Sequence, residues 1–135
     1  MTTTRLDSHP LQSISRRRRA AAEIALAMGG FGIGTGEFAI MGLLPNVGAD
    51  LGLTAPQVGH LISAYALGVV VGAPLIAVMA ARLPRRLLLI VLMLVFAAGN
   101  FASALAPTYG SVMLFRFLSG LPHGAYFGVA ALVAA

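Results

Sequence analysis

Four long apolar stretches, separated by short segments rich in turn-forming residues, constrain this chain more than any other feature. They cover about residues 20–44, 58–81, 87–105 and 111–135. Because an α-helix rises about 1.5 Å per residue, about 20 apolar residues cross the roughly 30 Å hydrocarbon core of a bilayer. Only 10% of the 135 residues are charged, which is too few to cover a water-soluble domain. The sequence therefore predicts an all-α membrane protein with about four transmembrane helices.

The segments outside these stretches carry the predicted boundaries. Pro45 is predicted to end the first helix, because proline lacks the N–H that a helix interior needs. Residues 1–19 are polar and contain a run of four arginines, a composition typical of a solvated, disordered tail.

The arginines predict how the chain is oriented. Five of the nine lie in residues 1–19 and three lie at Arg82, Arg85 and Arg86, whereas the other two loops contain none. The positive-inside rule therefore places the N-terminus and the loop of Arg82 in the cytoplasm of a multi-pass inner (plasma) membrane protein. The net charge of +5 is read as this orientation signal, and no nucleic-acid partner is expected. A cleaved secretory signal is disfavoured, because the first apolar stretch is too long and three more follow.

Glu37 and Arg116 are charged residues inside the predicted spans. A charge there costs roughly 2.5–3.5 kcal/mol on insertion scales, so both side chains are expected to face protein or a water-filled cavity. From the predicted helix ends, Glu37 lies about 10 Å and Arg116 about 8 Å inside the outer surface. We therefore expect them to pair if their helices adjoin, so that protonation of Glu37 releases Arg116 for another anion.

The last apolar stretch carries more polar residues at helical spacing from Arg116. His123 and Tyr126 fall on one face with Arg116, and His123 is expected near the membrane midplane, where an imidazole can carry protons. The alternative for His123 is a packed hydrogen-bonding residue. Asn100 is the strongly polar residue of the third stretch. The candidate proton-coupling or substrate pathway residues are therefore Glu37, Asn100, Arg116, His123 and Tyr126.

Motifs for catalysis and cofactors are missing from the sequence. It contains no cysteine, and no phosphate-binding loop, metal-ligand spacing or cofactor fingerprint is found. Ser119 and His123 share one helix face without a base on a second helix, and the glycine of a serine-hydrolase elbow is replaced by Phe117. We expect no enzyme activity, no metal and no cofactor.

The basic loop and the last stretch resemble two motifs of the major facilitator superfamily. The loop motif D-R-x-G-R-[RK] appears as Ala81-Arg82-Leu83-Pro84-Arg85-Arg86. Its three arginines match the family's gating loop, but an alanine replaces the acid, so the acid's gating role is not carried over. The motif R-x-x-x-G-x-x-x-G of the fourth helix appears as Arg116-Phe117-Leu118-Ser119-Gly120-Leu121-Pro122-His123-Gly124, and the family assigns its arginine to proton coupling. Thr35-Gly36-Glu37-Phe38 resembles the branch of arabinose-efflux permeases and multidrug–proton antiporters.

This resemblance implies more than the four helices. The family fold has twelve helices in two halves, with the substrate between them, so the chain is expected to be an N-terminal part that needs further helices, or another chain, to be complete. The implied function is proton-coupled efflux of a small molecule, a drug or a sugar. Two alternatives stay open. One is a small dimeric four-helix multidrug exporter, and the other is a membrane-embedded structural or assembly subunit without transport activity.

Overall fold

The computed structural model describes residues 9–79 and 83–134. It contains four helices, α1 (His9–Asp50), α2 (Ala55–Met79), α3 (Arg85–Ala104) and α4 (Tyr109–Ala134). The described residues contain no strand. The predicted all-α chain with four helices is therefore confirmed.

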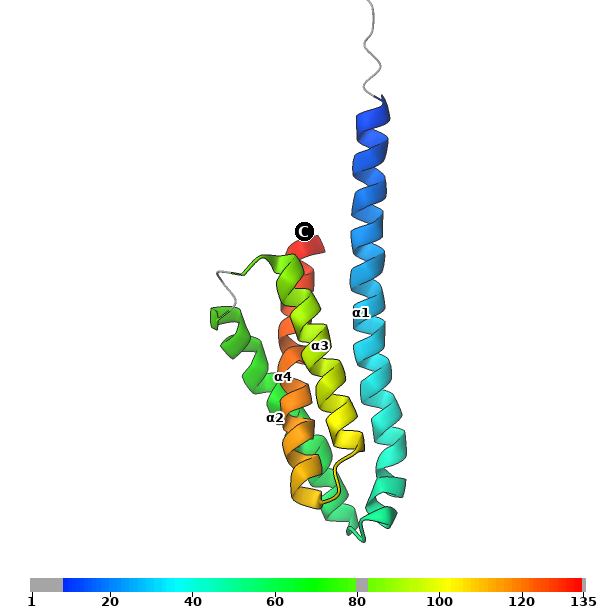
Figure 1. Cartoon of the computed structure of the whole chain (residues 1–135), viewed down its shortest axis with the longest axis vertical. Helices are drawn as coiled ribbons and strands as arrows, with labels where there is room; N and C mark the ends of the chain where they lie inside the picture. Colours follow the sequence, from blue (N-terminus) through cyan, green and yellow to red (C-terminus); the bar gives the residue numbers. More distant parts are fainter. Residues whose placement is uncertain (1–8, 80–82, 135) are drawn as a thin grey trace, which may run out of the picture.

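The first helix is longer than predicted at both ends. Helix α1 has 42 residues, a length of about 63 Å at 1.5 Å per residue, and its N-terminal part projects beyond the other helices (Figure 1). It includes residues 9–19, which we predicted to be disordered, whereas residues 1–8 lie outside the described part of the chain. Arginine is a good helix former, and adding turns to an existing helix avoids the cost of nucleation, so the arginine run extends the apolar helix.

The predicted end of α1 at Pro45 was wrong. Pro45 lies inside the helix, which continues to Asp50. Proline removes one backbone hydrogen bond but does not prevent the following turn from forming. The chain turns instead at Gly52, whose φ of +63° is a left-handed conformation that glycine adopts without strain. Glu37 consequently lies further from the C-terminal end of its helix than the sequence suggested.

Matching polar pairs begin α2 and α4, the two helices that follow the turns at residues 51–54 and 105–108. The backbone N–H of Thr54 donates to Oε1 of Gln57 at 2.8 Å, and the backbone N–H of Thr108 donates to Oγ of Ser111 at 3.1 Å. In both places the side chain of the third helical residue accepts a hydrogen bond from the backbone N–H of the residue that precedes the helix, as in a capping box. Helices α2 and α4 therefore begin slightly before the predicted residues 58 and 111.

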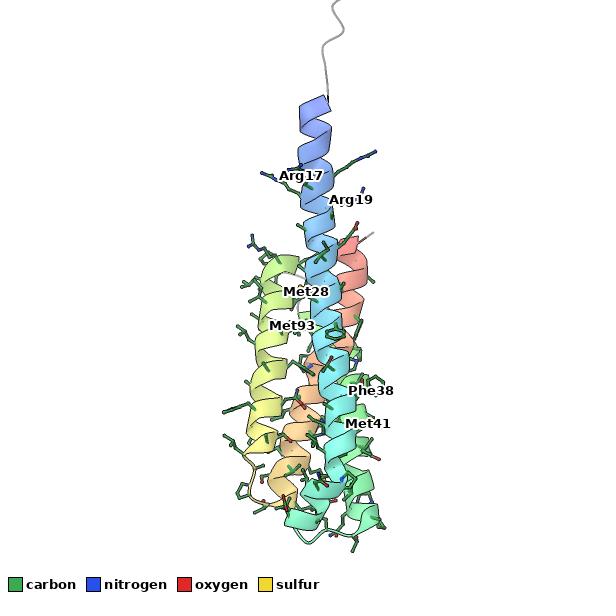
Figure 2. The ribbon with its side chains drawn as sticks, turned by 90° about the vertical axis from the view of Figure 1, so that its right-hand side faces the viewer. Arg17, Arg19, Met28, Phe38, Met41 and Met93 are labelled. Atoms are coloured by element: carbon green, nitrogen blue, oxygen red, sulfur yellow. The ribbon has the colours of Figure 1, made fainter. Side chains whose placement is uncertain are left out.

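Helix α4 lies at the centre of the packing. It packs most extensively against α2 and next against α3, whereas α1 makes far fewer contacts with the other helices, which it runs alongside (Figures 1 and 2). Glycines bring α2 and α4 together, because a Cβ at Gly68 or Gly72 would overlap the backbone of α4, and one at Gly120 or Gly124 would overlap the backbone of α2. This close approach of two backbones is typical of small-residue packing in membranes.

The outer surface of the helices is apolar. Three helical segments are long and apolar enough to cross a membrane, namely Arg16–Asp50, Ala55–Ile76 and Arg85–Ala104. Helix α4 carries the polar residues Arg116 and His123 and the proline Pro122 within its otherwise largely apolar sequence. Large apolar side chains such as Phe31 and Phe38 on α1 are more than 70% exposed, as expected where the solvent is lipid or further apolar protein.

Candidate functional site

Arg116 is a buried charge at the centre of the packed helices. Its side chain is only 1% exposed, and its guanidinium carbon lies 4.3 Å from the centre of the Tyr65 ring on α2. This is cation–π geometry, which is stronger in a desolvated site. Within the described residues, Nε and Nη1 of Arg116 have no hydrogen-bond partner. The Tyr65 ring is thus a contact of a guanidinium that has no ion pair within residues 9–79 and 83–134.

Tyr65 also contacts His123. Its hydroxyl oxygen lies 2.7 Å from Nδ1 of His123, a hydrogen bond whose direction depends on the tautomer of the imidazole. The two rings meet edge to face, with centres 5.7 Å apart. Tyr65 is only 3% exposed, and a buried phenol normally requires such a polar partner. One tyrosine therefore connects Arg116 and His123, although both of these residues are on α4.

Glu37 reaches the same group from α1. Its Oε2 lies 3.9 Å from Nδ1 of His123, and the side chains of His123 and Glu37 are 15% and 35% exposed. Because α1 continues to Asp50, Glu37 lies about 20 Å from the C-terminal end of its helix, and His123 lies about 21 Å from the start of α4. The ion pair that we predicted between Glu37 and Arg116 does not form in the described part of the chain. Glu37 instead pairs with His123, which lies about two helical turns further along α4 than Arg116.

Tyr126 and Asn100 lie apart from this group. Tyr126 donates its hydroxyl to the carbonyl oxygen of Leu26 on α1 at 3.0 Å, so it ties α1 to α4 nearer the arginine-rich end. Asn100 donates its amide to Phe96 of its own helix at 2.9 Å, while its Oδ1 is buried and has no partner among the described residues.

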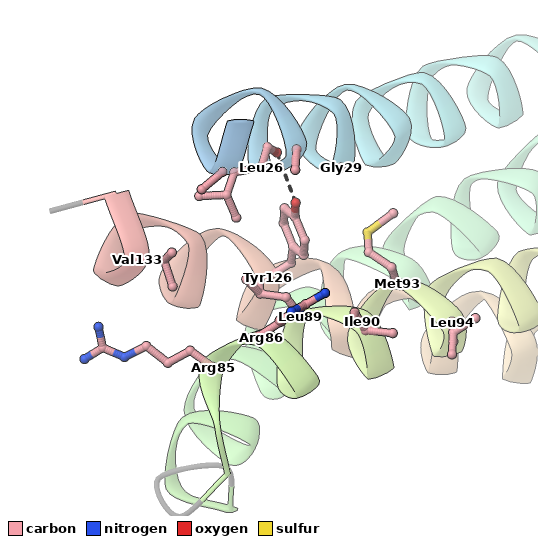
Figure 3. A pocket seen from close by; sticks show the side chains of 12 residues that line it. Leu26, Gly29, Arg85, Arg86, Leu89, Ile90, Met93, Leu94, Tyr126 and Val133 are labelled. Carbon is pink, nitrogen blue, oxygen red and sulfur yellow. Dashed lines mark hydrogen bonds between the residues drawn. The ribbon is translucent and has the colours of Figure 1, made fainter. Parts of the chain in front are cut away.

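Arg85 and Arg86 of the predicted gating loop lie at the end of the molecule where α3 begins. Arg85 Nη1 donates to the carbonyl oxygen of Leu132 at 2.7 Å, which ties the start of α3 to the last turns of α4. Arg86 lines an apolar pocket of about 740 Å³ between α1, α3 and α4, with Tyr126 at its wall (Figure 3). Arg82 lies outside the described residues. The pocket is separate from Glu37 and His123, neither of which lines it.

Sequence reasoning missed Tyr65 as a site residue. A phenol in the middle of an apolar helix needs a hydrogen-bond partner, and this signal alone could have singled it out. The sequence pattern did not predict that α2 packs against α4, which glycines on both helices permit. The group therefore consists of Glu37 from α1, Tyr65 from α2 and Arg116 and His123 from α4.

Comparison with known proteins assigns the family. Residues 26–135 match the family model described as Major Facilitator Superfamily. The chain is 52% identical over 112 residues to the inner membrane transport protein YdhP of Escherichia coli strain K12, covering 83% of this chain and 29% of that protein. It is 44% identical over 110 residues to the putative transporter AraJ of the same strain, covering 82% of this chain and 28% of AraJ.

A more distant relative has a drug-related name. The chloramphenicol resistance protein of Streptomyces lividans is 37% identical over 110 residues, covering 82% of this chain and 28% of that protein. No solved structure matches the chain significantly. The chain spans less than a third of the length of these relatives. Since the family model covers all four helices except the first part of α1, this multi-pass membrane chain belongs to the major facilitator superfamily.

Proposed function

We propose that this chain is part of a proton-coupled exporter of small organic molecules, in which Glu37 and His123 carry the coupled proton. The observation that supports this proposal is the 3.9 Å separation of two ionisable side chains, both partly accessible, on two membrane helices. A carboxylate and an imidazole at this distance can share one proton, since each is stabilised by the opposite charge of the other. An ionisable group inside a membrane helix is a functional candidate by default.

Arg116 is proposed to set the balance of charge in this group. It stays buried behind Tyr65, so it holds a fixed positive charge beside the group without forming an ion pair with Glu37. Tyr126 and Asn100, which lie apart from this group, are proposed to line other parts of the pathway, and the loop arginines are proposed to hold the cytoplasmic ends of the helices. The hydrogen bond of Arg85 to Leu132 supports this last assignment.

The proposed substrate is a small molecule, a drug or a sugar. The name of the Streptomyces lividans relative supports the drug class. Because the relatives are more than three times longer than the matched part, we propose that the transport unit contains further helices, from the same polypeptide or another. The proposed orientation places the N-terminus in the cytoplasm, following the arginines.

The experiment measures substrate-driven proton movement in inverted membrane vesicles that contain the full reading frame encoding this chain. Vesicles are acidified by respiration, and chloramphenicol, cationic dyes or pentoses are added while an acidity-sensitive dye reports the pH gradient. A transported substrate should collapse the gradient, and Glu37→Gln or His123→Asn should remove this response while the protein stays in the membrane. Asp50→Asn, which changes an exposed carboxylate on the same helix, is the matched control and should respond normally. A normal response in Glu37→Gln would overturn the proposal.

A further inference from the structure

Two side chains from different helices lie near one nitrogen atom. Nδ1 of His123 is 2.7 Å from the Tyr65 hydroxyl and 3.9 Å from Oε2 of Glu37. A ring nitrogen of histidine is either one donor or one acceptor, so it forms one good hydrogen bond at a time. Tyr65 on α2 and Glu37 on α1 therefore compete for the same atom.

The protonation state of the imidazole decides which partner suits this nitrogen. When Nδ1 is unprotonated it can accept the Tyr65 hydroxyl, but it cannot bind a carboxylate, which only accepts. When Nδ1 carries a proton it must donate, and a carboxylate is the stronger acceptor, because charge-assisted hydrogen bonds are roughly twice as strong as neutral ones. The short contact with Tyr65 and the longer one with Glu37 fit the first state, with the proton of the neutral ring on Nε2.

Arg116 favours the same assignment. Its guanidinium lies over the Tyr65 ring and draws electron density from it, which makes the phenol a better donor and a poorer acceptor. The titratable groups that lie against His123 are Tyr65 on α2 and Glu37 on α1, and Arg116 on α4 lies against Tyr65. The part of α3 within the apolar stretch contains no titratable residue.

We propose that Tyr65 is a positioning residue that fixes the tautomer of His123 and so controls when Glu37 can pair with it. The proposal rests on the proposed proton-coupling role of Glu37 and His123.

The proposed proton transfer conserves atoms and charge. The proton on the Glu37 carboxyl moves to Nδ1 of His123, the hydrogen bond from the Tyr65 hydroxyl to Nδ1 breaks, and a carboxylate and an imidazolium remain as an ion pair. The reverse step returns Nδ1 to Tyr65. A proton thus exchanges the hydrogen bond of His123 to Tyr65 on α2 for an ion pair with Glu37 on α1, a helix that makes few contacts with the others.

The test observes the tautomer directly by ¹⁵N NMR of histidine-labelled protein in lipid nanodiscs at high pH, where the imidazole is neutral. The chain has three histidines, so the His123 signals are assigned by replacing each in turn. In the wild type we expect the proton of His123 on Nε2. In Tyr65→Phe, which keeps the ring beneath Arg116 but removes the hydroxyl, we expect it on Nδ1, donated to Glu37, so that the protonated and unprotonated nitrogens exchange identities.

A second tyrosine–histidine pair provides the matched control. The Tyr109 hydroxyl lies 3.1 Å from Nδ1 of His60 at the outer end of the molecule, so Tyr109→Phe should alter the His60 signals and leave His123 unchanged. If Tyr65→Phe does not fold, a second comparison at low pH decides, namely the rate at which the Nδ1 proton of His123 exchanges with water in the wild type and in Glu37→Gln. The exchange should be at least tenfold faster in Glu37→Gln, because the carboxylate that accepts this proton is missing. A His123 proton that stays on Nε2 in Tyr65→Phe, or an exchange rate unchanged by Glu37→Gln, overturns the proposal. Because neither readout requires transport, loss of the tautomer effect is distinct from loss of coupled export.

Discussion

Gly68 on α2 lies so close to Phe117 on α4 that a Cβ at Gly68 would overlap the Phe117 carbonyl oxygen. The contact is reciprocal one turn away, where a Cβ at Gly120 would overlap the carbonyl oxygen of Tyr65. The glycines therefore set the distance between the helix that carries Tyr65 and the helix that carries Arg116 and His123. The geometry of the proposed coupling group depends on this spacing.

Gly68→Ala should destabilise the protein and disturb the site. Inserting a methyl group into a close-packed contact typically costs about 1–3 kcal/mol, and here the overlapping atom is backbone, which has little freedom to move away. We expect a lower temperature of unfolding in detergent and a loss of the tautomer preference of His123. Gly59→Ala on the same helix is the control, since its Cβ would meet nothing within 4 Å. Equal stability of the two variants would contradict this packing.

The sequence predicted the helices well and their exact ends poorly. Apolar length and composition determined that four helices form, because a chain in lipid must satisfy its backbone hydrogen bonds within each segment. Pro45 was misleading because a proline inside a helix removes one hydrogen bond and clashes with the preceding turn, which can kink the helix without ending it, whereas Gly52 has the left-handed φ that turns the chain. Such a choice depends on the contacts of the following turn, which a local pattern does not contain.

The same error explains the wrong partner for Glu37. Measured from Pro45, Glu37 matched the depth of Arg116, but measured from Asp50 it matches the depth of His123, and the structure pairs these two residues. The residues on α4 were identifiable from helical spacing and from the resemblance to the family. Tyr65 was not identified, because its role follows from the packing of α2 against α4 and this pairing of helices is a tertiary property.

The orientation of the chain gives a prediction for reporter fusions. A reporter placed after Arg19 or within the loop of Arg85 should be active in the cytoplasm, and one placed after Asp50 or at Tyr109 should be active outside. Eight arginines flank one side of the apolar helices and none lies in the two outer turns, which is a strong positive-inside bias. The opposite pattern of activity would reverse the orientation.

Tyr126 should hold the arginine-rich part of α1 against α4. Its hydroxyl donates to the Leu26 carbonyl oxygen, and a typical hydrogen bond of this kind contributes about 0.5–1.5 kcal/mol. Tyr126→Phe should therefore increase the access of a cysteine-specific label to Leu26→Cys, an informative probe because the chain has no cysteine of its own.

Two glycines beside this contact make a matched pair. A Cβ at Gly29 would overlap the Tyr126 hydroxyl, whereas one at Gly30 would lie 3.4 Å from Phe127, an ordinary contact. Gly29→Ala should thus mimic Tyr126→Phe in the labelling experiment, and Gly30→Ala should behave like the wild type. Labelling that is the same in all four proteins would show that this hydrogen bond does not hold α1 in place.

Arg116 should be costly for stability and necessary for coupling. A buried charge without an ion pair is strongly unfavourable, and Nε and Nη1 of Arg116 have no partner among the described residues. Arg116→Met fills a similar volume without charge, so we expect it to stabilise the protein, by up to about 4 kcal/mol, the upper end of the range seen when buried ion pairs are replaced by apolar residues. The same variant should abolish substrate-driven proton movement, because the positive charge beside Tyr65 is lost.

Arg116→Lys is the control for this prediction. It keeps the charge and should therefore gain no stability. The measurement is thermal unfolding of each variant in the same detergent, and a lower unfolding temperature for Arg116→Met than for the wild type would mean that the guanidinium pairs with a group outside the described residues.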